Sequence, residues 1–299
     1  MTSFVAAVNA PPIVLDGGLA TQLEARGHDL SSELWSARLL AEDPAEVLAA
    51  HGDFFAAGAQ VAISASYQVS YEGMAAAGFD ATETTRLLAL SVDLARRAAN
   101  ETPGSEPRWV AASVGPYGAS LADGSEYNGD YKLSVAQLRA WHRPRLAALI
   151  AAAPDVLALE TIPCLAEVEA ILAEVSGTGV PSWLSLTNVG AATRLGEPLV
   201  EAFAMAREIP EVVAVGVNCC AAVGLEAILA EAVAASGKPA IAYPNSKEGW
   251  DGPGRAWTGE PAFDPTAAVG WVLAGAALVG GCCRVTPADI SAVRAALVR

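Results

Sequence analysis

The sequence predicts an α/β fold, a single (β/α)8 barrel of the TIM type, and three observations lead to this prediction. Eight short apolar runs recur along the 299 residues, and Ala- and Leu-rich stretches with helical spacing separate them. The runs are continuously apolar rather than alternating, as in parallel strands that are buried on both faces. The repeat is roughly 37 residues, which suits this barrel. A doubly wound open sheet is the competing interpretation, and strand count and spacing favour the barrel.

The predicted elements follow in chain order. The strands are Ile13–Asp16, Gln60–Ser64, Trp109–Val114, Val156–Glu160, Ser182–Thr187, Val212–Val217, Pro239–Tyr243 and Ala277–Val279. The clearest helices are Thr82–Ala99, Val135–Ala152, Leu165–Val175, Leu225–Ala235 and Ala288–Leu297. Helix start signals support two of them, because Ser134 precedes the second and Thr286-Pro287 precedes the last. No low-complexity linker divides the chain, so we expect residues 1–299 to form one domain, with residues 1–11 flexible or lightly packed.

Composition excludes several classes of protein. Hydrophobic residues make up 53% of the chain, enough for a large core, so a disordered chain is excluded. The formal net charge of -15 makes the chain a poor phosphate binder, and we expect no nucleic-acid partner. The N-terminus lacks a signal-peptide pattern, and the apolar run Ala267–Val279 is shorter than the ~20 residues that span a bilayer. We therefore expect a cytoplasmic protein, a monomer or weak homodimer, that acts on small molecules.

Chemically active residues gather where the predicted strands end. Active sites of this fold lie at the carboxyl ends of the strands. The residues at those positions are Asp16-Gly17-Gly18, Ser64 with Tyr67, Ser113-Val114-Gly115-Pro116, Glu160-Thr161, Thr187-Asn188, Asn218-Cys219-Cys220, Pro244-Asn245-Ser246 and Gly280-Gly281-Cys282-Cys283. Two carboxylates, three amides and two pairs of thiols at one rim exceed what a purely structural barrel needs.

The cysteines suggest a metal site rather than a disulfide framework. There are five, an odd number, and four of them form two adjacent pairs. Cys219 and Cys282 are 63 residues apart, which does not fit a zinc finger but could unite thiols from two strand ends. Three thiolates on Zn²⁺ leave one coordination position open, the pattern of a catalytic site. Adjacent side chains diverge, so Cys220 is not expected to join Cys219, and Cys164 is expected to be a buried apolar residue.

Motifs along almost the whole chain resemble the homocysteine S-methyltransferase family, in particular its S-methylmethionine-dependent branch. The most distinctive run is Leu121-Ala122-Asp123-Gly124-Ser125-Glu126-Tyr127. The other matching segments are Asp16–Glu24, Leu34–Ala37, Ser64–Gln68, Ser113–Gly118, Glu160-Thr161, Gly216–Cys219, Tyr243–Ser246 and Gly280–Arg284. Val285, Cys220, Lys247 and the stretch 188–198 depart from the family pattern, and they put the choice of donor in doubt rather than the metal chemistry.

The resemblance implies that Cys219, Cys282 and Cys283 hold Zn²⁺ and that homocysteine sulfur is the fourth ligand. A free thiol titrates near pH 8.5, and zinc deprotonates it, so the thiolate could attack the methyl carbon of a sulfonium. Asp16 and Glu160 are expected to bind the homocysteine ammonium, although Asp16 could simply be an Asp-Gly turn residue.

The remaining site residues are assigned less directly. Backbone amides near Gly17 could bind the substrate carboxylate, and Asn218 and Asn245 could orient the zinc loops or the substrate. Tyr67 and Tyr127 are candidates for the donor pocket, because aromatic rings attract sulfonium cations. The long loop 115–132 could close over the donor as a lid, although a solvated surface loop is an equal alternative.

Two alternative functions stay open. The first is the same zinc chemistry with betaine, S-adenosylmethionine or methylfolate as donor, or with a selenol as acceptor. The second is a thiol-redox or noncatalytic zinc-binding barrel, in which the adjacent cysteines form a disulfide or sequester metal.

Overall fold

Eight parallel strands form a closed barrel in the computed structural model, which describes residues 3–10, 12–30, 36–246, 249–251 and 256–298. The barrel strands are β1 Ile13–Val14, β2 Val61–Ile63, β3 Trp109–Val114, β4 Val156–Ile162, β5 Ser182–Leu186, β8 Val212–Asn218, β9 Ala240–Tyr243 and β12 Ala276–Val279. They pair in the order β1-β12-β9-β8-β5-β4-β3-β2. A parallel bridge between Leu15 and Val61 joins the two ends of this order and closes the barrel.

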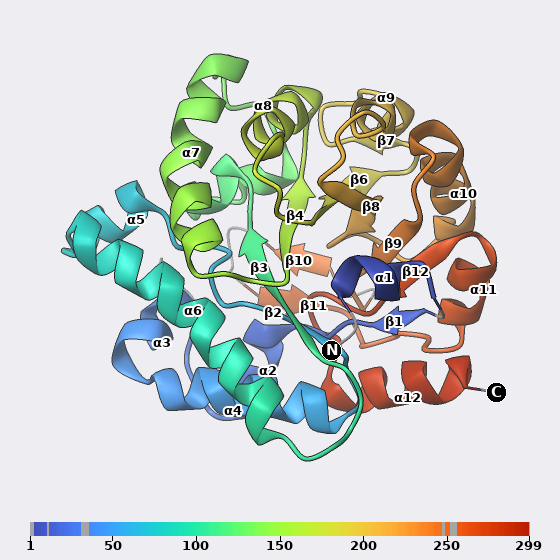
Figure 1. Ribbon diagram of the computed structural model, residues 1–299, viewed down its shortest axis with the longest axis horizontal. Helices are drawn as coiled ribbons and strands as arrows, with labels where there is room; N and C mark the ends of the chain where they lie inside the picture. The colour runs from blue at the N-terminus through green and yellow to red at the C-terminus, as the bar shows by residue number, and fades with distance from the viewer. Residues whose placement is uncertain (1–2, 11, 31–35, 247–248, 252–255, 299) are drawn as a thin grey trace.

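The helices surround the barrel on its outside, apart from α1, which packs against the interior core (Figure 1). They are α1 Phe4–Val8, α2 Leu19–Ala25, α3 Ser36–Glu42, α4 Pro44–Ala56, α5 Tyr71–Ala76, α6 Ala81–Glu101, α7 Val135–Ala151, α8 Leu165–Val175, α9 Leu199–Met205, α10 Leu225–Ser236, α11 Ala267–Leu273 and α12 Pro287–Leu297. The predicted start signals are used, since Ser134 and Thr286 each form a capping box at the first turn of α7 and α12. The (β/α)8 prediction is confirmed, and all eight predicted strands occur, with ends within two residues of the prediction.

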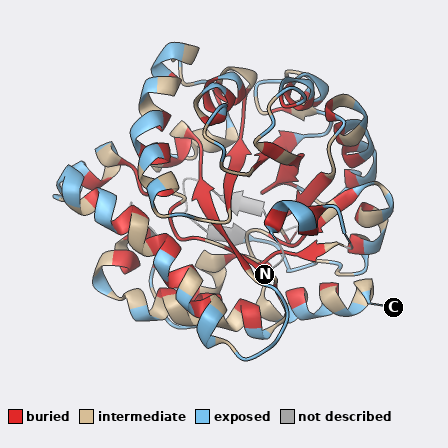
Figure 2. Cartoon of the chain, in the orientation of Figure 1, coloured by how far each residue is buried: buried red, intermediate tan, exposed pale blue. Residues whose placement is uncertain are grey.

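The strands are buried on both faces, as Figure 2 shows. Every residue of β3 and β4 is buried. One apolar cluster packs the outer face of the strands against the helices, and a second fills the barrel interior around Trp109, Trp183 and Tyr243. Two-sided burial explains why the strands read as continuous apolar runs in the sequence.

The N-terminal segment differs from the expectation. Residues 1–11 were expected to be flexible or lightly packed, but Phe4–Val8 form a helix in which Phe4, Ala7 and Val8 are buried. The Phe4 ring lies 5.9 Å from Trp109 and 6.2 Å from Trp183 between ring centroids, so it covers the interior core of the barrel. The expectation of light packing was therefore wrong for Phe4–Val8, because the burial of Phe4 against two tryptophans orders this segment. Residues 1–2 and 11 lie outside the described part of the chain.

Two antiparallel hairpins and two short 3-10 helices extend the strand ends. The hairpins are β6 Asn188–Val189 with β7 Ala192–Thr193 and β10 Gly249–Asp251 with β11 Ala256–Thr258. The 3-10 helices η1 Tyr117–Leu121 and η2 Ser125–Tyr127 lie within the predicted lid loop 115–132. Within the described ranges, every helix is too short or too polar to cross a bilayer. Leu34, Trp35 and Lys247, which the sequence comparison singled out, fall outside those ranges.

Candidate active site

A cavity opens at the carboxyl ends of the strands, where the sequence places the chemically active residues. Its walls come from the loops after β1, β2, β3, β4, β8 and β12, and from the 3-10 segment around Tyr127. The sequence-predicted residues Gly17, Tyr67, Tyr127, Glu160, Asn218, Cys219, Cys282 and Cys283 all line it. Asp16 lies at the same strand end, with only 1% of its surface exposed. Asn245 is not among the lining residues, but it contacts the cysteine loop.

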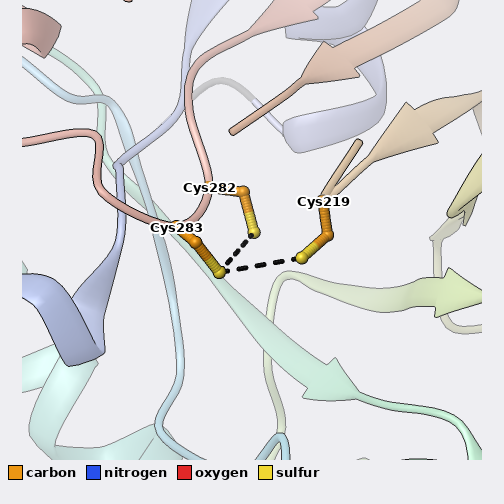
Figure 3. A group of neighbouring side chains, drawn as sticks. All are labelled: Cys219, Cys282 and Cys283. Carbon is orange, nitrogen blue, oxygen red and sulfur yellow. Dashed lines mark hydrogen bonds between the residues drawn. The ribbon is translucent and has the colours of Figure 1, made fainter. Parts of the chain in front are cut away.

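Three thiols converge in this cavity. The sulfur atoms of Cys219, Cys282 and Cys283 all lie within 4.8 Å of one another (Figure 3). Cys219 Sγ is 3.7 Å from Cys283 Sγ, and Cys282 Sγ is 4.0 Å from Cys283 Sγ. Cys219 follows β8 and the other two follow β12, so the barrel unites thiols that are far apart in the sequence.

The backbone around the thiols is tightly fixed. Cys219 adopts φ 49°, a left-handed conformation that is uncommon for a residue with a side chain and that clusters at functional sites. Asn245 Oδ1 accepts a hydrogen bond from the Cys283 amide at 3.1 Å, and the Cys282 amide donates to the Pro244 carbonyl at 2.8 Å. The loop after β9 therefore holds both members of the cysteine pair. This places Asn245 as a support of the cysteine loop.

The electrostatics of the three thiols favour a bound cation. Hydrogen bonds from the Cys282 and Cys283 thiols, together with those from Tyr127 and Asn245, lower the pKa of Cys219 well below its ordinary value. The Cys219 thiolate in turn raises the pKa values of Cys282 and Cys283, because further ionisation would place negative charges side by side. Only one of the three thiols can ionise easily alone. A divalent ion such as Zn²⁺ fits this donor set because it stabilises several thiolates at once.

Glycines allow the loops after β1 and β12 to pack closely beneath the thiols. A Cβ atom on Gly17 would lie 2.4 Å from the Val285 carbonyl oxygen, and one on Gly281 would lie 2.2 Å from Val285 Cγ1. The Gly18 amide donates to the Val285 carbonyl at 2.9 Å, and the Gly281 amide donates to the Asp16 carbonyl at 3.1 Å. Glycine is needed at these positions because the loop after β1 and the loop after β12 pack too closely for a side chain. This close packing brings Asp16 next to the cysteine loop.

Asp16 and Glu160 are two buried carboxylates with different surroundings. Asp16 Oδ2 accepts from the Ile63 amide at 2.8 Å, while its buried Oδ1 has no hydrogen-bond partner. Glu160 accepts from the Ser113 hydroxyl and, at 3.1 Å, from the Tyr243 hydroxyl. Burial raises the pKa of Asp16 well above its ordinary value and that of Glu160 to about 7. A cationic group on a ligand would relieve both penalties.

Asn218 is engaged within the protein. Its Oδ1 accepts from the Thr161 amide and from the Ser185 hydroxyl, each at 2.8 Å, and its Nδ2 donates to Thr161 Oγ1 at 2.8 Å. Thr161 adopts φ 61°, and it follows Glu160 directly. Asn218 therefore links the ends of β4 and β8, and it fixes the backbone on either side of Glu160 and Cys219.

The loop 115–132 forms one wall of the cavity. Tyr127 OH lies 3.0 Å from Cys219 Sγ, and Glu126 lines the same wall. Buried Glu167 anchors the start of the loop, since its Oε1 accepts from the Tyr117 amide at 2.6 Å and contacts His142 Nε2 at 2.8 Å. Tyr67 faces the loop from the end of β2, and Gly115 packs against its ring.

Two arginines that sequence reasoning missed support this wall. Arg145 of α7 is buried, and it donates to the carbonyls of Ser66, Tyr67 and Gly115 at 2.6–2.8 Å, so it ties the loops after β2 and β3 together. Arg194 lies 5.3 Å from the centre of the Tyr127 ring and donates to Thr187 Oγ1. In the sequence both are ordinary helix or loop arginines, and no spacing signal identifies them.

The two other cysteines stay outside the cluster. Cys220 and Cys164 are buried, with 3% and 2% of their surfaces exposed. Burial raises the pKa of Cys164 to about 12 and that of Cys220 above its usual range. Both are buried small residues here, which the sequence predicted for Cys164 and left open for Cys220.

Comparison with known proteins decides the family. The sequence profile of the homocysteine S-methyltransferase family matches residues 13–297. The chain belongs to this family. It is 45% identical to homocysteine S-methyltransferase of Escherichia coli K12 over 95% of this chain and 94% of that protein. Homocysteine S-methyltransferase YbgG of Bacillus subtilis is 42% identical over 95% of this chain and 94% of its own length.

A solved structure from the same family shares the fold. The metallated form of the homocysteine methyltransferase MmuM from Escherichia coli superposes with a TM-score of 0.85 at 41% identity, covering 96% of both chains. The family resemblance inferred from the sequence is thus confirmed, as is the barrel on which it depends.

Proposed function

We propose that this protein transfers a methyl group from a sulfonium donor, S-methylmethionine, to the sulfur of L-homocysteine. The bond between methyl carbon and donor sulfur breaks as the bond to homocysteine sulfur forms. The breaking bond leaves its electron pair on the donor sulfur, which becomes a neutral thioether. The homocysteine thiol loses its proton on binding, so each turnover yields two molecules of methionine. The observation that carries this proposal is the cluster of three thiols inside a cavity walled by carboxylates.

Cys219, Cys282 and Cys283 would hold Zn²⁺, which supplies a deprotonated, nucleophilic thiolate from a thiol bound in its open position. The fit is chemical as well as spatial, because three soft sulfur donors within 4.8 Å suit zinc and leave room for a further ligand. Asn245 keeps the Cys283 amide in place, and Asn218 fixes the backbone that leads into Cys219. The protein's own contribution is thus a rigid donor set.

The acceptor's amino group would bind to Asp16 and Glu160. Asp16 Oδ1 is buried without a partner, and Glu160 is held by hydroxyl donors that leave it able to accept from an ammonium. Charge-assisted hydrogen bonds to both carboxylates would orient homocysteine so that its sulfur reaches the thiol cluster. The Gly17 backbone amide would supply a donor for the substrate carboxylate, whereas the Gly18 amide already donates to the Val285 carbonyl.

The lid and its neighbours would bind the donor and exclude water. Tyr127 and Tyr67 present aromatic surface to a sulfonium cation, and Arg145 holds the Tyr67 backbone against the loop after β3. Closure of the segment 115–132 would protect the reacting atoms.

The direct test is product formation. Purified protein is incubated with homocysteine and, in turn, with S-methylmethionine, S-adenosylmethionine and betaine, and methionine is quantified. We expect the highest turnover with S-methylmethionine, one zinc per chain, and loss of activity on chelation. No methionine from any sulfonium donor would overturn the proposal. A metal-free protein with a Cys282–Cys283 or Cys219–Cys283 disulfide as its working state would favour the thiol-redox alternative.

We further propose a cytoplasmic monomer. All five cysteines are free thiols, and the cluster needs reduced sulfur to work. Sedimentation of the purified protein and fractionation of the source cells check these two points.

A further inference from the structure

The loop 115–132 brings into the cavity a carboxylate of which one oxygen has no hydrogen-bond partner. Glu126 lies in η2 and lines the cavity, and its Oε2 is buried without a hydrogen-bond partner. Asp16 and Glu160, which lie at the ends of β1 and β4, already provide the acceptors for the homocysteine ammonium. Glu126 comes from a different loop, the one after β3, on the segment that carries Tyr127. It is therefore left over once the acceptor has been placed.

The charge of the cavity is one-sided. Among the described residues that line the cavity there is no Arg, Lys or His. Four of these lining residues are carboxylates, Glu24, Asp123, Glu126 and Glu160. Arg194 stacks on Tyr127 from outside the cavity wall and donates to Thr187. Burial raises the pKa of Glu126 to about 7. A carboxylate with a buried oxygen and no cationic side chain beside it in the cavity wall is strongly stabilised by a cationic ligand.

The lid holds Glu126 in this position. Its backbone amide packs against Gly118, where a Cβ atom would lie 2.5 Å from the Glu126 nitrogen. Asp123 Oδ1 accepts from the Ser125 amide at 2.9 Å, and Glu167 anchors the Tyr117 amide. The backbone that leads into Glu126 is thus held at Tyr117 and Ser125, and this places the side chain in the cavity wall.

We propose that Glu126 is the counter-ion of the donor's sulfonium, and that it selects donors with a permanent positive charge at the reacting sulfur. This proposal rests on the proposed function. Tyr67 and Tyr127 line the same part of the cavity, so the cation meets one carboxylate and two aromatic rings. Glu126 acts in binding and positioning, and no proton passes through it.

The chemistry gives this role a kinetic signature. Methyl transfer turns the sulfonium into a neutral thioether, so the attraction to Glu126 is strongest before the reaction and weakens as the transition state forms. Such an interaction lowers KM without raising kcat. It also disappears in the product, which favours release of the demethylated donor.

The test compares Glu126→Gln with Asp130→Asn, which removes one negative charge from the same loop. Asp130 is exposed and pairs with Lys132 at 2.7 Å, outside the cavity wall. For E126Q we expect KM for S-methylmethionine to rise at least about tenfold, the loss expected of a charge-assisted contact, with kcat unchanged or higher. KM for homocysteine and the zinc content should stay at wild-type values. D130N should change neither KM.

Trimethylsulfonium serves as a second probe, because it carries the cation and no amino or carboxyl group. Its binding, measured by calorimetry on the zinc-loaded protein, should weaken in E126Q by the same factor as the donor KM. Unchanged donor KM, a rise in homocysteine KM instead, or an equal effect of D130N would overturn the proposal. If E126Q fails to fold by circular dichroism, E126D replaces it, and this shorter acid should retain most of the trimethylsulfonium affinity.

The two proposals fail in different ways. If the wild-type protein makes no methionine from any sulfonium donor, the proposed function fails. Trimethylsulfonium binding still decides the role of Glu126, because wild-type protein that does not bind this cation refutes it. If the wild type is active and E126Q matches it in donor KM, only the role of Glu126 fails.

Discussion

Replacing Asn218 with alanine should destabilise the barrel and weaken the metal site together. The side chain is fully buried and makes three hydrogen bonds, two to Thr161 and one to Ser185. Alanine would leave the Thr161 amide without an acceptor, at a residue held at φ 61°. The bond from the Thr161 amide to Asn218 supports the left-handed backbone at Thr161. Glu160 is the residue directly before Thr161.

The size of the effect follows from the partners that are left unpaired. A buried amide that loses its acceptor costs about 1–3 kcal/mol, whereas the Ser185 and Thr161 hydroxyls can rotate toward other acceptors and lose less. We therefore expect a loss of about 3 kcal/mol, which lowers Tm by roughly 6–10 °C for a chain of this size. Zinc affinity should fall about tenfold, since Asn218 precedes Cys219 and acts as a support of the ligand loop.

Thermal unfolding by circular dichroism and zinc competition with a chromophoric chelator measure the two effects. Ser185→Ala is the matched control, because it removes one of the three hydrogen bonds and should cost about 1 kcal/mol. Added to N218A, it should cause little further loss, because its partner is already gone. A Tm change below roughly 2 °C in N218A, or full additivity of the two substitutions, would refute the reasoning.

Three other perturbations test the same picture. Cys282→Ala should reduce the zinc content from one per chain to near zero by metal analysis, while the circular dichroism spectrum is unchanged. The control is Cys220→Ala, which should retain the metal because its thiol lies outside the cluster. Zinc retention by C282A would show that the ligand set is wrong. Burial raises the pKa of Glu160 to about 7, so its ionised fraction should fall about tenfold from pH 8 to pH 6. We therefore expect kcat/KM for homocysteine to decline below pH 7. This pH dependence should vanish in E160Q. Gly216→Ala should abolish soluble expression or lower Tm sharply, because its Cβ would lie 1.9 Å from the Ile241 carbonyl oxygen; normal yield and Tm would contradict that close approach.

The sequence predicted the parts of the fold that burial dictates. Strands buried on both faces, such as β3 and β4, leave uninterrupted apolar runs, and long amphipathic helices such as α6 leave a clear period. Short elements leave neither signal. Helix α1 has five residues, and its order comes from the packing of Phe4 on Trp109 and Trp183, which no local pattern reveals. The two-residue strands β6 and β7 were missed for the same reason.

In the site, too, some features could be predicted from the sequence and others could not. The position of a residue at a strand end predicted which side chains meet, and the three thiols do meet. What each polar atom binds could not be predicted, because it depends on neighbours from distant strands. Asn218 was expected to orient the zinc loops or the substrate, and only the structure shows that its side-chain amide binds Thr161 and Ser185. Buried Arg145 acts on three carbonyls from two loops, a contact that only the folded chain creates.

The division of the thiols between β8 and β12 sets an order of events during biosynthesis. A nascent chain that has been made as far as β9 holds Cys219 but neither Cys282 nor Cys283. One thiolate binds zinc weakly, so metal capture has to wait for the last strand. Cells short of zinc would then accumulate finished barrels that can be charged later, and any truncation that removes the final βα unit would yield a chain unable to hold the ion.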